Sequence, residues 1–133
     1  MTHPTLTAWH ALVASRNARG LKALLADDVV FHSPVVHTPQ LGRLVTTQYL
    51  AAAFQVFFNT SFKYVREIAS ESDAALEFAV EIDGITVNGV DMIKWDDAGK
   101  IIDFKVLIRP LKAINLIHQK MAAMLQASEH QTV

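Results

Sequence analysis

The chain has 133 residues, a formal net charge of −1, and no cysteine. A chain of this length forms one domain, and its near-neutral charge argues against nucleic acid or an anionic membrane as a partner. The lack of cysteine excludes disulfides, thiolate catalysis and cysteine-bound metals. Its hydrophobic fraction of 51% favours an apolar cavity or a buried dimer interface.

The amino-terminal segment, Met1 to Thr7, lacks the basic and apolar regions of a signal peptide. The most apolar run, Tyr49 to Phe58, is too short to span a bilayer. We therefore expect a cytoplasmic protein without a membrane partner. It should be a single domain over residues 1–133, in which residues 126–133 form a polar tail.

The first part of the chain predicts helices. Thr5 or Thr7 can cap a first helix, in which apolar residues recur at helical spacing and which ends near Gly20. A short second helix is expected over residues 21–25. It should be closed by the segment Ala26-Asp27-Asp28.

A β-branched and aromatic run over residues 29–33 predicts a strand that Pro34 stops. Alternation places Ser33 on the inner face and His32 on the outer face. The following segment, 35–42, has no periodicity and predicts a loop with His37 near its middle.

The rest of the chain predicts a third helix, four strands and a last helix. The third helix is expected at residues 44–58 and the last helix at residues 111–125. Two strands are expected at residues 62–69 and 74–83, and two more in a long hairpin that ends at Pro110. The order predicts an α+β fold: a cone-shaped, curved antiparallel sheet with helices packed on its concave face, and an extra C-terminal helix.

The strongest candidate for a functional residue, Asp91, lies in the hairpin. Alternation places it on the same face as Val87, Gly89, Ile93 and Trp95. An ionised carboxylate among apolar groups is costly unless it is paired or protonated. Asp91 is therefore either a buried carboxylate satisfied by neighbours such as backbone amides, Trp9, Tyr49 or a histidine, or a ligand-binding or catalytic group with a raised pKa.

The order of these motifs resembles the NTF2-like superfamily, which includes the SnoaL-like polyketide cyclases and ketosteroid isomerase. The resemblance rests on Ala26-Asp27-Asp28 followed by the run to Pro34, a loop that contains glycine, a third helix, Gly89-x-Asp91 and Gly99-Lys100-Ile101. It implies a cone-shaped fold with an internal pocket, commonly assembled as a homodimer through the outer face of the sheet.

Ketosteroid isomerase uses a general-base Asp and an oxyanion hole made of a Tyr and a protonated Asp. In the resemblance, Asp91 matches the protonated Asp, Trp9 stands where the Tyr would be, and Ser33 stands where the base would be. A serine hydroxyl without an adjacent base cannot accept a proton near neutral pH. The two replacements argue against ketosteroid isomerase activity itself.

The candidate catalytic residues are Asp91, as acid or hydrogen-bond donor, and His37, as a replacement base, although His37 can equally be a surface histidine. His118 is expected in a core or an interface. The candidate ligand-binding residues are Trp9, Ser33, Tyr49, Phe54, Phe78 and Phe104. No metal site and no cofactor are expected, because the histidines show no ligand spacing.

Two functions from different classes remain open. The first is an isomerase, cyclase or lyase that acts by proton transfer on a small, largely apolar carbonyl compound. The second is a non-catalytic ligand-binding or dimerisation module with the same pocket. In both, the expected partners are a small apolar molecule and a second copy of the chain.

Overall fold

The structure is a computed structural model that describes residues 3–131, with side chains described over residues 3–127. Within this described part there are five helical segments: α1 Pro4–Ser15, η1 Ala18–Gly20, α2 Leu21–Leu24, α3 Arg43–Phe57 and α4 Leu111–Gln131. The strands are β1 Leu25–His32, β2 Gln40–Leu41, β3 Lys63–Ala69, β4 Asp73–Ile82, β5 Ile85–Trp95 and β6 Ile101–Arg109.

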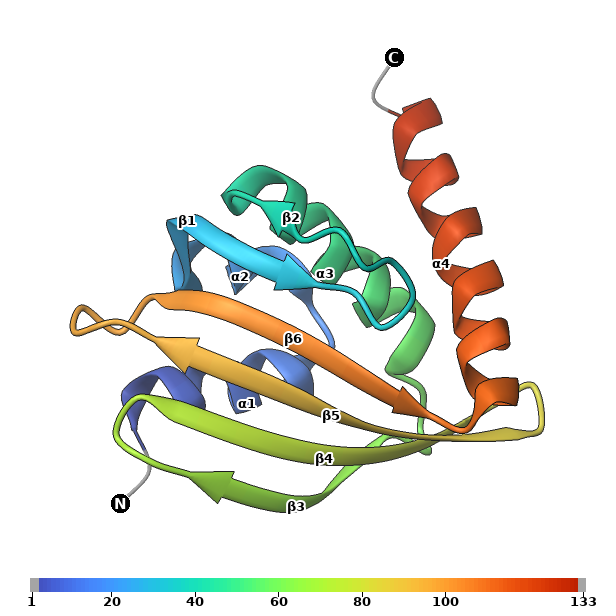
Figure 1. Cartoon of the computed structure of the whole chain (residues 1–133), viewed down its shortest axis with the longest axis horizontal. Coiled ribbons are helices and arrows are strands. Elements are labelled where there is room, and N and C mark those ends of the chain that lie inside the picture. The colour runs from blue at the N-terminus through green and yellow to red at the C-terminus, as the bar shows by residue number, and fades with distance from the viewer. Residues whose placement is uncertain (1–2, 132–133) are drawn as a thin grey trace.

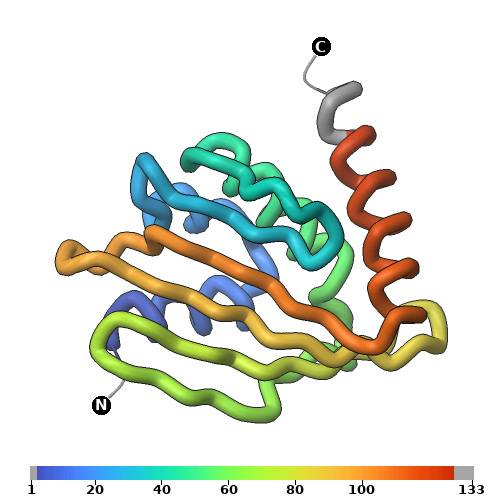
Figure 2. Tube along the Cα trace, in the orientation of Figure 1, coloured from blue at the N-terminus to red at the C-terminus, as the bar shows by residue number. Residues whose placement is uncertain are grey.

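The strands form one curved sheet in the order β2-β1-β6-β5-β4-β3. Figure 1 views it from the side opposite α1, α2 and α3, while α4 stands at one end. After α3 the chain forms β3 at one edge of the sheet, and β4, β5 and β6 then follow side by side toward the opposite edge. As a result β6 arrives beside β1, far from it in sequence (Figure 2).

The expected α+β fold with helices on one face of a curved sheet and an extra C-terminal helix is confirmed. The sheet is mixed, because β1 and β6 pair in parallel while the other pairs are antiparallel. The parallel pairing begins at Leu25, opposite Ile101. For this reason the segment Ala26-Asp27-Asp28, expected to close a helix, belongs to a strand.

Both ends of α1 differ from the prediction. The N-cap is His3, whose Nδ1 accepts a hydrogen bond from the backbone N–H of Thr5, so the expected threonine caps are wrong. The Thr5 hydroxyl instead donates to the carbonyl oxygen of Gly99 at 2.7 Å, which joins α1 to the β5–β6 turn. The helix ends at Ser15, because Arg16 adopts a left-handed conformation with φ 56°.

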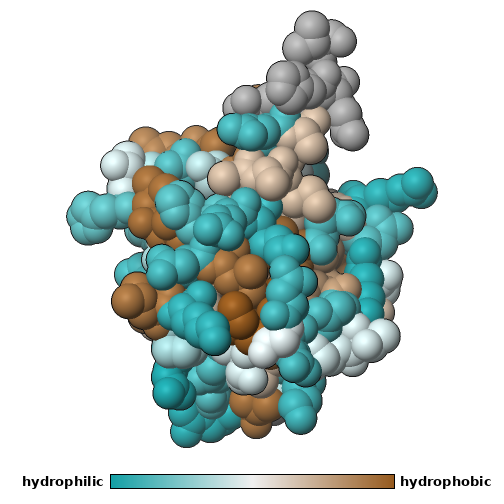
Figure 3. Space-filling model, turned by 90° about the vertical axis from the view of Figure 1, so that its right-hand side faces the viewer, coloured by the Kyte–Doolittle hydropathy of each residue, from teal (hydrophilic) through white to brown (hydrophobic). Residues whose placement is uncertain are grey.

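Helix α4 also extends beyond the predicted end at residue 125. Its backbone is helical to Gln131, so most of the expected polar tail is helix, and residues 132–133 lie outside the described residues. Figure 3 shows a face of the molecule on which apolar patches alternate with hydrophilic side chains. Over residues 3–131, no helix is both long enough and apolar enough to cross a membrane.

Candidate functional site

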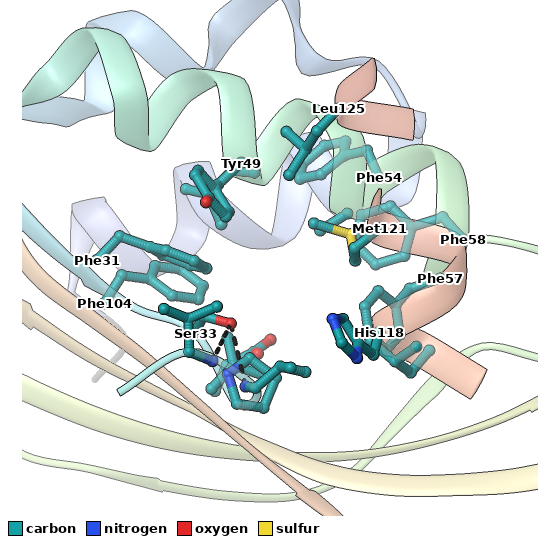
Figure 4. A pocket seen from close by; sticks show the side chains of 18 of the residues that line it. Phe31, Ser33, Tyr49, Phe54, Phe57, Phe58, Phe104, His118, Met121 and Leu125 are labelled. Atoms are coloured by element: carbon teal, nitrogen blue, oxygen red, sulfur yellow. Dashed lines mark hydrogen bonds between the residues drawn. The ribbon is translucent and has the colours of Figure 1, made fainter. Parts of the chain in front are cut away.

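An apolar cavity of about 190 Å³ lies between the inner face of the sheet, α3, α4 and the loop after β1. Figure 4 shows Phe31 and Phe104 on one side, Tyr49 and Phe54 from α3 above, and His118, Met121 and Leu125 from α4 opposite. The C-terminal helix is therefore a wall of the cavity. The loop residues Ser33, Pro34, Val35 and Val36 complete the lining.

Aromatic rings hold the shape of this cavity. Phe31 packs against Tyr49 and Phe104, with ring centroids 5.4 Å and 6.2 Å apart, and Trp9 meets Phe54 edge-on at 5.8 Å. Such contacts stabilise a fixed arrangement of large side chains. All six candidate ligand-binding residues predicted from the sequence line the cavity: Trp9, Ser33, Tyr49, Phe54, Phe78 and Phe104.

Asp91 is the charged residue of the cavity lining. It lies in the middle of β5, is only 8% exposed, and points to the face that also carries Ile93 and Val87. Burial raises the pKa of its carboxyl group from 3.8 to about 7, although a hydrogen bond from Tyr64 lowers that pKa in part. The carboxyl group can therefore exchange a proton near neutral pH.

A chain of two hydrogen bonds orients this carboxyl group. The Tyr64 hydroxyl donates to Oδ2 of Asp91 at 2.7 Å, and the Trp9 indole N–H donates to the Tyr64 oxygen at 3.0 Å. Burial and the neighbouring Asp91 hold the pKa of the Tyr64 phenol well above its ordinary value, so this hydroxyl remains a donor. Oδ1 of Asp91 has no hydrogen-bond partner among the described side chains or backbone.

Trp9 therefore does not offer its N–H to the cavity as a second donor, because Tyr64 accepts it. Tyr64 was missed at the sequence level, since β3 is an edge strand with mostly exposed residues. The available signal was its position two residues after Phe62 on the face that turns inward. The register pairs Tyr64 with Phe78, whose ring lines the cavity, and this brings the hydroxyl to Asp91.

Ser33 lines the cavity as expected, and its oxygen has backbone partners, whereas His37 is placed differently from the prediction. The Ser33 oxygen accepts hydrogen bonds from the backbone N–H groups of Val35 and Val36 at 3.1 and 3.3 Å (Figure 4). This hydroxyl stabilises the turn of the loop. His37 is exposed farther along that loop and is not part of the cavity lining, so the structure does not bring the candidate base to Asp91.

His118 lines the cavity instead, from α4. Its helix position was predictable from the apolar stripe of residues 111–125, but the place of that helix against the sheet was not. Among the described side chains, no group of three or more His, Asp or Glu residues could hold a metal ion.

These features define an α+β domain in which helices and a curved sheet surround an apolar cavity with a buried acid in its lining. The family model described as "SnoaL-like domain" matches residues 6–104, which is most of the chain. The chain therefore belongs to the SnoaL-like domain family, within the NTF2-like superfamily. No curated protein sequence matches it.

Solved structures agree with this assignment. A steroid delta-isomerase from Pseudomonas aeruginosa is 36% identical, with a TM-score of 0.90 and coverage of 95% of this chain and 92% of its own. An uncharacterized protein with a cystatin-like fold from Silicibacter pomeroyi DSS-3 is 34% identical, with a TM-score of 0.85 and coverage of 92% and 85%.

A more distant structure shares the fold. It is a protein with a ketosteroid isomerase-like fold from Catenulispora acidiphila DSM 44928, in complex with trimethylamine, at 17% identity and a TM-score of 0.63. The match covers 86% of this chain and 91% of that one. At this identity the likeness concerns the fold alone.

Proposed function

We propose that the protein is an enzyme that binds a small, largely apolar carbonyl compound in the cavity and catalyses proton transfer on it, in the isomerase or cyclase range. The observation that carries the proposal is Asp91: a buried carboxyl group with a pKa of about 7 at the edge of an aromatic cavity. A protonated carboxyl group can donate a hydrogen bond to a carbonyl oxygen as that oxygen gains negative charge.

Tyr64 and Trp9 support this role, because they hold Asp91 without occupying its second oxygen. An oriented donor in an apolar site stabilises a developing oxyanion far more than a donor in water does. The relative described as a steroid delta-isomerase supports the isomerase class. The ligand is held mainly by aromatic contact, and the hydrogen bond from Asp91 sets the orientation of its carbonyl group.

The size of the cavity favours a small ligand. Its volume of about 190 Å³ is slightly larger than the roughly 150 Å³ of an engineered cavity that binds benzene, and smaller than the roughly 300–1,000 Å³ of common ligand sites. A ligand of one or two rings fits inside. A steroid is larger than this volume and would have to extend out of the cavity.

The test uses 3-cyclohexen-1-one, whose isomerisation to the conjugated enone is followed by ultraviolet absorbance, and 4-nitrophenol, whose oxygen imitates an enolate. The wild-type protein should bind the phenol and isomerise the ketone, whereas Asp91→Asn should lose both tight binding and turnover. Asp97→Asn, at an exposed turn residue, is the matched control. Equal turnover by wild type and Asp91→Asn would contradict the proposal.

A non-catalytic ligand-binding module is the second candidate. The observation that favours it is that Ser33, which stands where ketosteroid isomerase has its base, has a hydroxyl oxygen that accepts two backbone hydrogen bonds within the loop and has no adjacent base to activate it. In that case 4-nitrophenol would bind to the cavity without any turnover of the ketone by the wild-type protein.

We also propose that two copies associate through the outer face of the sheet. Ile68, Met92 and Leu107 are 64%, 46% and 47% exposed on three of its strands, among charged side chains such as Lys105. An apolar centre with a charged rim is typical of a dimer interface. The cytoplasmic location expected from the sequence stays a prediction.

A further inference from the structure

We propose that His118 is the general base that works together with Asp91, and that helix α4 thereby completes the catalytic pair. This inference rests on the proposed function, because it assigns a second role within the same cavity. It replaces the expected base His37, which lies outside the cavity lining.

The position of His118 is fixed by the helix that carries it. Ala113 and Ile117 are fully enclosed where the first turns of α4 pack against the body, with exposures of 0% and 1%. His118 follows directly, and Met121 and Ala122, one turn later, line the same cavity. Figure 4 shows the His118 ring directed into the cavity from α4.

The His118 ring is available for chemistry. The structure shows no hydrogen bond or ion pair between it and any side chain over residues 3–127, and the residue is exposed. In contrast, His3, His10 and His32 already have hydrogen-bond partners: His3 caps α1, His10 contacts Glu67 at 2.6 Å, and His32 contacts Asp103 at 2.9 Å.

Few groups compete for the role of base. The titratable side chains in the cavity lining are Tyr49 from α3, Asp91 from β5 and His118 from α4. Lys120, the nearest lysine along α4, forms an ion pair with Asp83 at 2.8 Å and is not part of the lining. If Asp91 donates to the carbonyl oxygen, the imidazole is the lining group best suited to accept a proton.

The reaction then needs no further reactant. A His118 ring nitrogen accepts the proton from the carbon between the carbonyl group and the double bond of the substrate. The electron pair of that C–H bond forms a new C=C bond, and the carbonyl π pair moves to oxygen, which is held by the Asp91 proton. Return of the proton from His118 to the distant carbon of the dienolate yields the conjugated isomer.

The test compares His118→Gln with wild type, with His37→Gln as an exposed-histidine control. We expect kcat for 3-cyclohexen-1-one to fall by about 10²-fold or more in His118→Gln. Binding of 4-nitrophenol, which imitates the enolate held by Asp91, should change less than about twofold, because a base contributes to rate and not to oxyanion binding. His37→Gln should match wild type in both.

A second variant separates chemistry from structure. Added imidazole should restore turnover to His118→Gly, and both variants should melt within a few degrees of wild type. Full turnover by His118→Gln, with turnover lost in Asp91→Asn, would overturn the role of His118 and leave the proposed function intact. Loss without rescue would also overturn it. A wild-type protein that binds the phenol but never isomerises the ketone would overturn both proposals.

Discussion

Replacing Asp91 with asparagine should change how stability depends on pH. The carboxyl group has its pKa raised from 3.8 to about 7 in the folded protein, so folding favours its protonated form. Below pH 3.8 the wild-type protein carries no penalty at this site. Stability is lost as pH rises between these two values, and the loss levels off above about pH 7.

The size of the effect follows from the same two pKa values. At about 1.4 kcal/mol per pH unit, ionisation of Asp91 costs about 4 kcal/mol of unfolding free energy at high pH. An asparagine side chain at this position cannot ionise and can still accept the Tyr64 hydrogen bond. Asp91→Asn should therefore be close to wild type in stability at pH 4 and more stable by up to about 4 kcal/mol at pH 8.

Urea unfolding of both proteins at pH 4, 6 and 8 measures this difference in stability. Every other titrating group is present in both proteins, so its contribution cancels when the two unfolding free energies are subtracted. Carbon NMR of the Asp91 carboxyl group gives its pKa directly. Tyr64→Phe removes the hydrogen bond that lowers this pKa, so the titration should move above about pH 7. A stability difference that does not vary with pH, or a pKa below about 4, would refute the reasoning.

Three further predictions concern packing and assembly. Gly89→Ala should destabilise the protein by about 1–3 kcal/mol or prevent folding, as judged by thermal melting, because a Cβ would lie 2.6 Å from the backbone oxygen of Leu107. Trp9→Ala should cost about 3–5 kcal/mol, since the indole is 2% exposed, whereas His37→Ala should leave the melting temperature nearly unchanged; equal losses would contradict this. Sedimentation should show a dimer at micromolar concentration that Met92→Glu or Leu107→Glu dissociates, and a wild-type monomer would exclude the interface.

The inward direction of Asp91 could be predicted from the sequence because β5 alternates strictly and strand periodicity is local. The buried partners of a strand depend on its neighbours. Tyr64 reaches Asp91 only through the β3–β4 and β4–β5 pairings, which place Phe78 opposite Tyr64 and also opposite Gly89. Register of this kind is set by the whole sheet, and no short pattern in β3 encodes it.

The first helix and β1 show where local rules fail. Thr5 has good capping chemistry, but its hydroxyl reaches Gly99, a partner 94 residues away. Leu25 begins a strand because it pairs with Ile101 where β1 and β6 run in parallel. Likewise, His118 was visible on an apolar stripe, but only the packing of α4 on α3 and the sheet decides that this stripe faces a cavity.

Helix α4 lies outside the matched segment, which ends at residue 104, although it forms one wall of the cavity. The polar end, built from Asp91, Tyr64 and Trp9, belongs entirely to the matched segment. The acid end of the site is thus fixed by the matched segment, whereas one wall of the cavity and the proposed base His118 come from the helix that follows it. A chimera that receives the terminal helix of a relative would change the shape of the cavity and would keep a base only if that helix supplies one, while the acid and its supporting hydrogen bonds stay in place.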